Sequence, residues 1–228
     1  MTKTQSKPDV GGAPAAAAPA PRRSLRRRIT RPIWLALRYV LGEGQYIVLH
    51  TWFRIMGPPR VLVYRHEINA RLLRAFGARI GQNVMMSAPI TLHNAPHGFA
   101  NLSIAEDCVM NGGAFLDLKC PITLERGVSL GPNVIIMTHN AFNKNPFLEA
   151  RLPRLVGEKP VLIGRGAGIK AAAVILHGVT IGEEALVAGG SFVSRNVPRR
   201  AYVSGVPAVV RRNLDEGGEG GRAPAQPG

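Results

Sequence analysis

Cysteine and acidic residues are both scarce in this chain of 228 residues. Its 2 cysteines, Cys108 and Cys120, are too few for a disulfide framework and favour a reducing compartment such as the cytoplasm. There are 14 Asp and Glu residues against 29 Lys and Arg, which gives a formal charge of +15 at pH 7. No apolar run reaches the ~18 to 20 residues that a membrane-spanning helix requires. The hydrophobic content of 46% is sufficient for one sizeable domain with appendages.

The excess of positive charge is concentrated at the N-terminus. Residues 1–31 contain eight basic residues and one acidic residue, Asp9, and residues 1–30 are rich in Ala, Pro and Arg. We predict that residues 1–30 form a disordered tail and that residues 213–228 form a second one. A basic arm of this kind is usually solvated, but it could also bind anionic lipid or another acidic polymer. Nucleic acid is disfavoured, because no basic face interleaved with aromatic residues accompanies the charge.

Two apolar stretches follow the tail, at residues 33–41 and 46–56, and a Gly-Glu-Gly sequence separates them. We interpret them as two short amphipathic segments in a helical region of residues 31–77. Their aromatic and arginine side chains suit peripheral binding to an anionic membrane. The alternative is that they pack on the body of the protein or on a neighbouring subunit. A further helix is predicted over residues 66–76, where apolar residues recur at helical spacing.

From residue 78 onward, apolar residues recur every six positions, which is the period of neither a helix nor a continuous strand. A six-residue step arises when a short strand is followed by a corner, and three such sides close one coil of about 18 residues. We therefore predict an all-β fold, a parallel β-helix of hexapeptide repeats over residues 78–212, interrupted by a long loop at residues 139–160. The positions predicted to point inward are Ile80, Met86, Leu92, Ile104, Met110, Leu116, Leu124, Leu130, Ile136, Ile163, Ile169, Ile175, Ile181, Val187 and Val193.

Two sequences near the end of the repeat carry a family resemblance. VLIGRGAGIKAAAVILHGVTIGEEALVAGGSFVSRNVP at residues 161–198, followed by VSGVPAVVRR at residues 203–212, resembles the closing coils of the hexapeptide-repeat acyltransferases. This group includes galactoside, maltose, xenobiotic and polysaccharide O-acetyltransferases. The resemblance implies a left-handed β-helix and a homotrimer, with acyl-CoA bound in the groove between adjacent copies. It implies an O-acyltransferase that uses acetyl-CoA as co-substrate and requires no metal.

The resemblance places the catalytic base at His139, in the sequence IIMTHNAF. A neutral imidazole can take the proton of a poorly nucleophilic hydroxyl as its oxygen attacks the thioester carbonyl. Asn111 and Asp117, about one coil earlier, are candidates for binding the acceptor or, in the case of Asp117, for orienting the imidazole. Asn140 is a candidate in the loop. The competing interpretation is structural, with Asn111 at a corner and Asp117 on a solvated strand.

Histidines can also bind metals, and carbonic anhydrases of similar fold use three of them across a subunit interface. His93 and His97 bracket a loop at a spacing that could bind a metal. No histidine follows His139 within a few residues, so the third ligand is missing and we expect no metal site. His177 is expected to be an exposed corner residue.

The resemblance also assigns coenzyme contacts by position. Small residues admit the narrow pantetheine arm, and arginines can pair with the phosphates. The chain departs from the family at Gly168 and Lys170, where Trp and Gly are common, so we expect the groove beside the thioester to differ in shape. The assigned residues are Ala171, Gly189, Ser194, Arg195, Gly205, Pro207 and Arg212.

The sequence RLLRAFGARIGQNV at residues 71–84 resembles the lead-in of polysaccharide-type members of the family. It implies that the acceptor is a sugar hydroxyl of a polysaccharide, a lipid-linked oligosaccharide or a glycolipid. The enzyme is then expected in the cytoplasm, with peripheral association at the inner face of the membrane. The alternatives are a xenobiotic or antibiotic O-acetyltransferase and a catalytically silent β-helix scaffold.

Overall fold

The computed structural model describes residues 25–216, apart from residues 59, 96, 142–144 and 153–155. Its internal contacts divide the chain into two units, residues 1–41 and residues 42–228. Helix α1 (Leu25–Met56) begins in the first unit and ends in the second. The second unit contains the β-helix.

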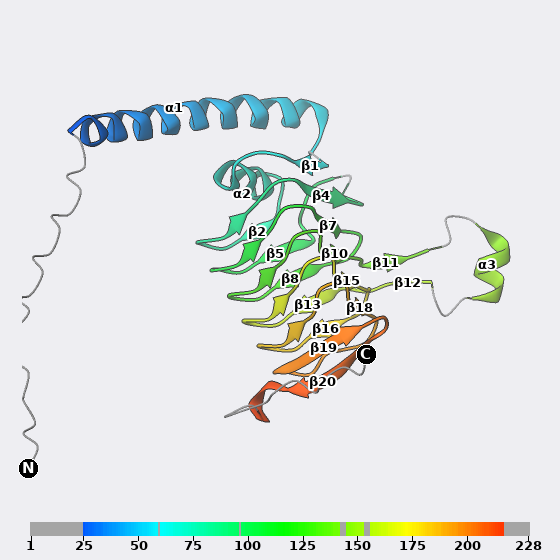
Figure 1. Cartoon of the computed structure of the whole chain (residues 1–228). Coiled ribbons are helices and arrows are strands. Elements are labelled where there is room, and N and C mark those ends of the chain that lie inside the picture. Colours follow the sequence, from blue (N-terminus) through cyan, green and yellow to red (C-terminus); the bar gives the residue numbers. More distant parts are fainter. Residues whose placement is uncertain (1–24, 59, 96, 142–144, 153–155, 217–228) are drawn as a thin grey trace, which may run out of the picture. The chain divides into compact units, whose positions relative to one another are not determined.

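The β-helix is a three-sided prism in which each coil contributes one short strand to each of three faces (Figure 1). Face 1 consists of β2 (Arg79–Ile80), β5 (Leu102–Ile104), β8 (Ile122–Leu124), β13 (Val161–Ile163) and β16 (Thr180–Ile181). Face 2 consists of β3 (Met85–Met86), β6 (Val109–Met110), β9 (Ser129–Leu130), β14 (Gly168–Ile169), β17 (Leu186–Val187), β19 (Ala201–Gly205) and β20 (Ala208–Asn213). Face 3 consists of β1 (Val61–Leu62), β4 (Ile90–His93), β7 (Ala114–Asp117), β10 (Ile135–Ile136), β15 (Val174–Ile175) and β18 (Phe192–Val193).

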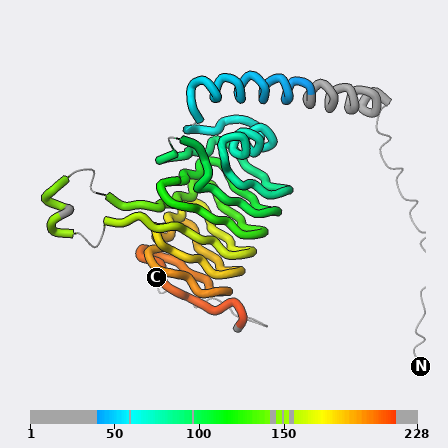
Figure 2. Tube along the Cα trace, turned by 180° about the vertical axis from the view of Figure 1, so that it is seen from behind, coloured from blue at the N-terminus to red at the C-terminus, as the bar shows by residue number. Residues whose placement is uncertain are grey.

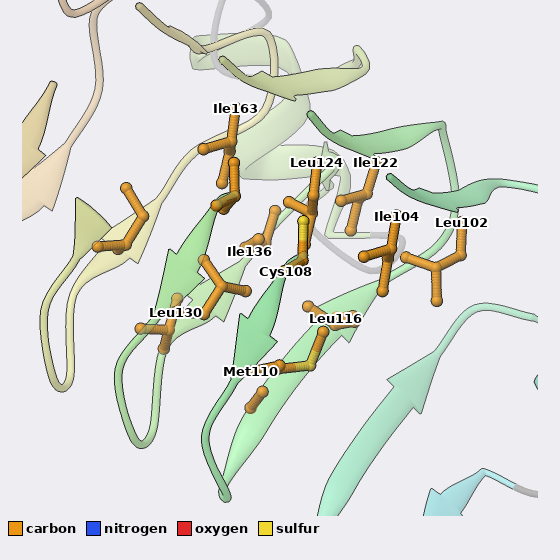
Figure 3. Packing of buried hydrophobic residues seen from close by; sticks show 14 of the residues in the cluster. Leu102, Ile104, Cys108, Met110, Leu116, Ile122, Leu124, Leu130, Ile136 and Ile163 are labelled. Carbon is orange, nitrogen blue, oxygen red and sulfur yellow. The ribbon is translucent and has the colours of Figure 1, made fainter. Parts of the chain in front are cut away.

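The core of the prism confirms the six-residue pattern. All fifteen positions predicted to point inward are buried, from Ile80 at 9% exposure to Ile163 and Ile175 at 0%. Parallel pairing stacks them in register, so that Leu124, Ile163 and Ile181 follow one another on face 1. Figure 3 shows part of this core, where Met110, Leu116, Leu124, Leu130, Ile136 and Ile163 lie among other buried side chains. Each fully buried aliphatic side chain contributes about 1.5–3 kcal/mol.

Some corners bring successive coils so close together that only glycine fits. A Cβ atom at Gly182 would lie 2.4 Å from the backbone nitrogen of Arg199, and one at Gly131 would lie 2.6 Å from that of Ala171. Both contacts are with backbone atoms, which cannot move aside as a flexible side chain can. The tight coil spacing at these corners therefore depends on the missing side chain.

Helix α1 differs from the prediction of two separate amphipathic segments. It runs without interruption from Leu25 to Met56, through the Gly-Glu-Gly sequence at residues 42–44. A glycine in a helix interior costs about 1 kcal/mol relative to alanine, which the packing of neighbouring turns can offset. We expected residues 1–30 to be disordered, but the helix begins within them, at Leu25. The physical reason is that LRRRI at residues 25–29 consists largely of good helix formers.

Within the second unit, one side of α1 packs on helix α2 (His66–Ala75). Glu43 Oε1 and Arg71 Nη1 form an ion pair at 2.5 Å, and the Arg71 guanidinium lies 3.8 Å from the centre of the Tyr46 ring. His50 stacks on the same ring, with the ring centres 5.5 Å apart. Residues 42–56 therefore pack on the body of the protein, as one of the two sequence-based alternatives proposed. No helix in the described part of the chain has the length and apolar content needed to cross a membrane.

The ordered chain also continues past residue 212, where the domain was expected to end. β20 ends at Asn213, and a short 3-10 helix spans Leu214–Glu216. Its Asp215 forms an ion pair with Arg200 at 2.9 Å, which links the segment to the last corner of the prism. The rest of the two predicted tails, residues 1–24 and 217–228, lies outside the described residues.

The predicted long loop emerges from the prism as a hairpin that carries a short helix (Figures 1 and 2). β11 (His139–Asn140) pairs with β12 (Gly157–Glu158) in antiparallel fashion, and α3 (Pro146–Arg151) lies between them in sequence. The side chain of Asn145 caps α3 by accepting a hydrogen bond from the backbone of Leu148 at 3.3 Å. The base of this hairpin begins at His139.

Candidate active site

His139 and Asp117 lie where face 3 turns into face 1, a position we call the 3–1 corner. Asp117 ends β7, and His139 follows β10, which is the parallel neighbour of β7 in the next coil. Their side chains meet, with Nδ1 of His139 2.5 Å from Oδ2 of Asp117. Asp117 is fully buried, whereas the His139 side chain retains 20% of its exposure. The arrangement presents one edge of the imidazole to a buried carboxylate and leaves the ring partly accessible.

Several further donors converge on the carboxylate. The backbone nitrogens of Thr138 and His139 donate to Oδ2 at 2.9 and 3.0 Å, and the Asn94 side chain donates to Oδ1 at 2.7 Å. Burial by itself raises the pKa of Asp117, but the hydrogen bonds from His139, Asn94 and Thr138 outweigh it and hold that pKa at about 2. Asp117 is therefore an ionised, fully hydrogen-bonded carboxylate at neutral pH.

This geometry assigns the tautomer of His139. An ionised carboxylate can only accept, so the short contact requires a proton on Nδ1. The other ring nitrogen, Nε2, then carries a free lone pair. No hydrogen bond of Nε2 to another described residue is present. The site therefore contains a basic nitrogen whose orientation is fixed by its partner.

Asn94 and Thr138 are parts of this site that the sequence did not point to. Asn94 follows β4, adopts a left-handed conformation with φ of 53°, and also lies 3.3 Å from Nδ1 of His139. Thr138 donates from its hydroxyl to the backbone oxygen of Asp117 at 2.7 Å and accepts from the backbone of Cys120 at 3.0 Å. Asn94 could have been identified as the asparagine that directly follows the predicted strand one coil before Asp117. Asparagine is common at such corners because it tolerates the left-handed conformation.

The proposed acceptor residues are only partly brought together. Asp117 is at the site, but as a buried partner of the imidazole rather than on a solvated strand. Asn140 adjoins His139 in β11, opposite Gly157. Asn111 follows β6, at the corner between face 2 and face 3, where its side chain donates to the backbone oxygen of Leu130 at 3.0 Å. Within one chain, Asn111 therefore has a structural contact at a different corner.

The assigned coenzyme positions are divided between the same two corners. Ser194 and Arg195 follow β18 and are exposed at the 3–1 corner. Ala171 and Gly189 stack on each other at the 2–3 corner, where a Cβ on Gly189 would lie 3.1 Å from the Ala171 oxygen. Gly205 and Pro207 form the turn between β19 and β20, at the same end of face 2. One chain thus presents the two groups on opposite edges of face 3.

The arginine nearest to this turn is Arg211 rather than Arg212. Arg211 donates to the Ser204 hydroxyl at 3.1 Å, and its guanidinium would lie 3.3 Å from a Cβ at Gly205. Arg212 pairs instead with Tyr202, further along β20. Both arginines are exposed.

His177 is not the exposed corner residue that we expected. It is half-buried, and its Nδ1 atom is inaccessible and has no hydrogen-bond partner. A Cβ at Gly157 would lie 3.5 Å from its ring, which places His177 against the base of the hairpin. Burial lowers the pKa of the His177 imidazole, and the charges of Lys159 and His139 act in the same direction.

A cavity and a third imidazole lie beside the His139–Asp117 pair. His93 Nδ1 is 3.7 Å from Asp117 Oδ1, and the His93 ring stacks near the His139 ring with centres 6.4 Å apart. A cavity of about 290 Å³ is lined by Arg60, Leu92, His93, Asn94 and Ala95. Across the residues whose positions are described, no three His, Cys, Asp or Glu side chains converge as metal ligands.

The chain is similar in sequence and in fold to known acetyltransferases. No protein-family model matches the chain. A galactoside O-acetyltransferase of Escherichia coli K12 is 24% identical over 174 residues, which cover 72% of this chain and 80% of that protein. A galactoside O-acetyltransferase of Lactococcus lactis is 27% identical over 156 residues, which cover 68% and 72%. A solved hexapeptide-repeat acetyltransferase of Vibrio cholerae, complexed with acetyl-CoA, is 28% identical with a TM-score of 0.54, covering 63% of this chain and 75% of that one. By sequence and by fold, the chain is similar to the hexapeptide-repeat acetyltransferases, and it shares their left-handed β-helix.

Proposed function

We propose that this protein transfers an acetyl group from acetyl-CoA to a sugar hydroxyl of a polysaccharide, a lipid-linked oligosaccharide or a glycolipid. The observation that carries the proposal is the His139–Asp117 pair, which leaves Nε2 of the imidazole as a free base. The Vibrio cholerae relative was solved with acetyl-CoA, which supports the choice of donor. The galactoside O-acetyltransferases support a sugar hydroxyl as the acceptor.

In this mechanism, Nε2 of His139 takes the hydroxyl proton as the acceptor oxygen attacks the thioester carbonyl carbon. The resulting imidazolium is stabilised by the ionised Asp117, which remains a carboxylate throughout. When the tetrahedral intermediate collapses, the carbon–sulfur bond breaks and the imidazolium returns its proton to the leaving thiolate. The products are the acetyl ester and free CoA, and no covalent enzyme intermediate forms.

The division of the coenzyme positions between two corners supports a site shared by adjacent copies in a homotrimer. The 3–1 corner of one copy would supply His139, Ser194 and Arg195, and the 2–3 corner of the next would supply Ala171 and Gly189. A site split in this way cannot be complete in one chain. In this arrangement Asn111, on the 2–3 corner, would also come to the groove from the neighbouring copy.

Two departures from the family pattern lie on the proposed coenzyme side. At Gly168 an added Cβ would lie 3.2 Å from Leu186 Cδ1, so Leu186 fills part of the space that a tryptophan side chain would need. Lys170 is exposed at the 2–3 corner, and its Cβ would lie 3.9 Å from a Cβ on Gly189. Lys170 is thus placed to add a positive charge beside the proposed coenzyme groove.

The test of this function is thioester-dependent release of CoA thiol with a panel of sugar acceptors, followed by mass spectrometry of the acetylated product. His139→Ala should reduce the rate by about 10²–10⁴-fold, because it removes the general base. His97→Ala is the matched control, since His97 is exposed in the loop after β4 and should not affect the rate. A rate unchanged in His139→Ala would reject the assignment of the site. Absence of thiol release with every acceptor would favour a catalytically silent scaffold, and thiol release without an acetylated sugar would indicate transfer to water.

We also propose that the enzyme works in the cytoplasm, associated peripherally with the inner face of an anionic membrane. In the second unit, α1 exposes the apolar side chains of Ile47, Val48, Trp52 and Ile55 at 55–72%. An apolar helix face next to a basic N-terminal segment is typical of interfacial binding.

Flotation with anionic vesicles tests this association. Deletion of residues 1–30 should weaken binding at low salt, because it removes most of the N-terminal positive charge, and should leave the folded assembly intact. Trp52→Glu should weaken binding at all salt concentrations. Equal flotation of the three proteins would contradict a membrane role for the N-terminal region.

A further inference from the structure

The cavity lined by Arg60, Leu92, His93, Asn94 and Ala95 opens beside the proposed catalytic imidazole. His93 is paired in register with Asp117 on adjacent strands, so the cavity wall is one coil away from the buried carboxylate. Asn94 connects the two directly, since its side chain contacts both Asp117 and His139. A group held in this cavity would therefore lie next to the hydroxyl that His139 activates.

The backbone of Arg60 is held rigidly at the mouth of this cavity. β1 runs antiparallel to β4 at the first coil, with Val61 opposite Thr91. The Arg60 oxygen accepts a hydrogen bond from the Leu92 nitrogen at 2.7 Å, which extends the pairing by one residue. The backbone position of Arg60 is thus fixed relative to the cavity wall, while its side chain is exposed.

The charge exposed at the cavity is positive, because Arg60 lines it and is exposed, whereas the ionised Asp117 beside it is buried. Among the described residues, Arg60 forms no ion pair. The Asp117 carboxylate, 3.7 Å from His93, is fully buried, and its oxygens accept hydrogen bonds from protein donors. Glu158, which lies across the hairpin from His139, is paired with Lys119 at 3.5 Å. An approaching anion would meet the guanidinium of Arg60 and the half-exposed imidazole of His93.

We infer that this cavity binds an acidic group of the acceptor, a carboxylate or a phosphate, and that the acceptor is an anionic sugar. The inference rests on the proposed function and names the class of its acceptor. A guanidinium offers two parallel donors that match the two oxygens of a carboxylate or phosphate. The volume of about 290 Å³ is just below the range of drug-sized ligand sites, about 300–1,000 Å³, and suits one sugar residue.

The test compares acceptors that share one ring and differ in charge: a methyl glucoside, the matching methyl glucuronide, and glucose 1-phosphate. With full-length protein and acetyl-CoA, the acidic sugars should be acetylated with the higher kcat/KM. Arg60→Ala should reduce kcat/KM for the acidic sugars by about 10- to 100-fold, because one charge-assisted contact is lost, and should leave the neutral sugar and the KM for acetyl-CoA unchanged. Arg60→Lys should preserve more activity with the phosphate than with the carboxylate, which distinguishes the two groups.

Arg79→Ala is the matched control. Arg79 lies in the same coil, exposed on face 1, so this variant removes the same charge from a surface away from the cavity. It should not change the preference for acidic sugars. An equal effect of both variants would mean that general surface charge, and not the cavity, selects the acceptor.

Three outcomes would overturn the inference without affecting the proposed function. They are a wild-type preference for the neutral sugar, an equal loss with neutral and acidic sugars in Arg60→Ala, or a raised KM for acetyl-CoA in that variant. If no sugar in the panel is acetylated, calorimetric titration of the same three sugars in the presence of CoA decides the question. Binding of the acidic sugars that Arg60→Ala abolishes supports the inference, and absence of such binding refutes it. Failure of the proposed function would instead appear as thiol release that does not depend on His139.

Discussion

The proposed role of Asp117 depends on contacts that are buried from solvent. Its two oxygens accept from a ring nitrogen, a side-chain amide and two backbone nitrogens, and its exposure is 0%. A neutral residue of the same shape would leave donors unpaired and would no longer select the tautomer of His139. The carboxylate is therefore expected to matter both for the rate and for stability.

Asp117→Asn should lower kcat by about 10²–10⁴-fold, because the imidazole loses the partner that fixes its tautomer. It should leave the KM for acetyl-CoA nearly unchanged. Asp107→Asn is the control, since Asp107 is an exposed acid paired with Arg126 at the corner between faces 1 and 2. A loss of rate in both variants would mean that Asp117 acts through overall charge.

The same substitution should have a pH-dependent effect on stability. The folded-state pKa of Asp117 lies below its ordinary value of 3.8, at about 2, so its stabilisation is present above about pH 4 and is lost as pH falls toward 2. Urea unfolding should show the wild type more stable than Asp117→Asn by about 2 kcal/mol at pH 7, with the difference vanishing near pH 2. A difference that does not change with pH would contradict an ionised buried carboxylate.

How far sequence could predict this site depends on the range of each contact. His139 was found from a family position, and Asp117 lies about one coil earlier, as expected. Asn94 is 45 residues from His139 in sequence, and the two meet only because irregular turns at the 3–1 corner stack above one another. The hydrogen-bonding role of Thr138 likewise depends on the exact position of Asp117 in the preceding coil. Because these contacts do not recur along the chain, no periodic pattern in the sequence predicts them.

At the scale of secondary structure, the coils were predictable and the N-terminal helix was not. Each side of each coil has an inward aliphatic residue followed by a corner, so the six-residue period predicts the strands of the whole prism. In α1, Gly42 and Gly44 are poor helix formers, and the helical conformation there is stabilised by a tertiary contact between Glu43 and Arg71. A period can be read from neighbouring residues, whereas a contact with another helix cannot.

Two glycine substitutions should have opposite effects on stability. Gly182→Ala places a methyl group 2.4 Å from a backbone nitrogen of the next coil, so we expect a loss of about 1–3 kcal/mol from overpacking. Gly44→Ala lies in α1 with no atom within 4 Å, so we expect a gain of about 0.5–1 kcal/mol from helix propensity. Denaturant unfolding measures both changes. Equal effects would contradict either the close coil spacing or the continuous helix.

For the whole molecule, the outer surfaces of the three faces differ in character. On face 3, Phe115, Ile135 and Val174 stack in one outward column and are half-buried even in a single chain. On face 1, the corresponding column is mostly polar, with Arg79, Ser103, Thr123 and Thr180 and one apolar residue, Leu162. An apolar column between the two corners that carry the proposed site suits contact with another copy, and the polar column suits solvent.

Ile135→Asp should prevent the proposed trimer from forming, because it places a charge in this column. Light scattering should report the mass of a single chain, circular dichroism should remain that of the β-helix, and acetyl transfer should be lost. Thr123→Asp is the matched control, with the same substitution at an outward strand position of face 1, and it should retain the mass and activity of the wild type. If Ile135→Asp keeps the wild-type mass, face 3 is not the contact surface.

The two ends of the β-helix affect how copies of the protein can associate. A stack of parallel strands offers its outermost rungs as a template on which another chain could continue the ladder. Here β1 lies antiparallel on the first rung of face 3, α2 contacts β2 and β3 beside it, and β20 folds back antiparallel on β19 at the far end. These covered strands disfavour lengthwise polymerisation into fibrils, whereas the outer faces of the prism stay open to association side by side.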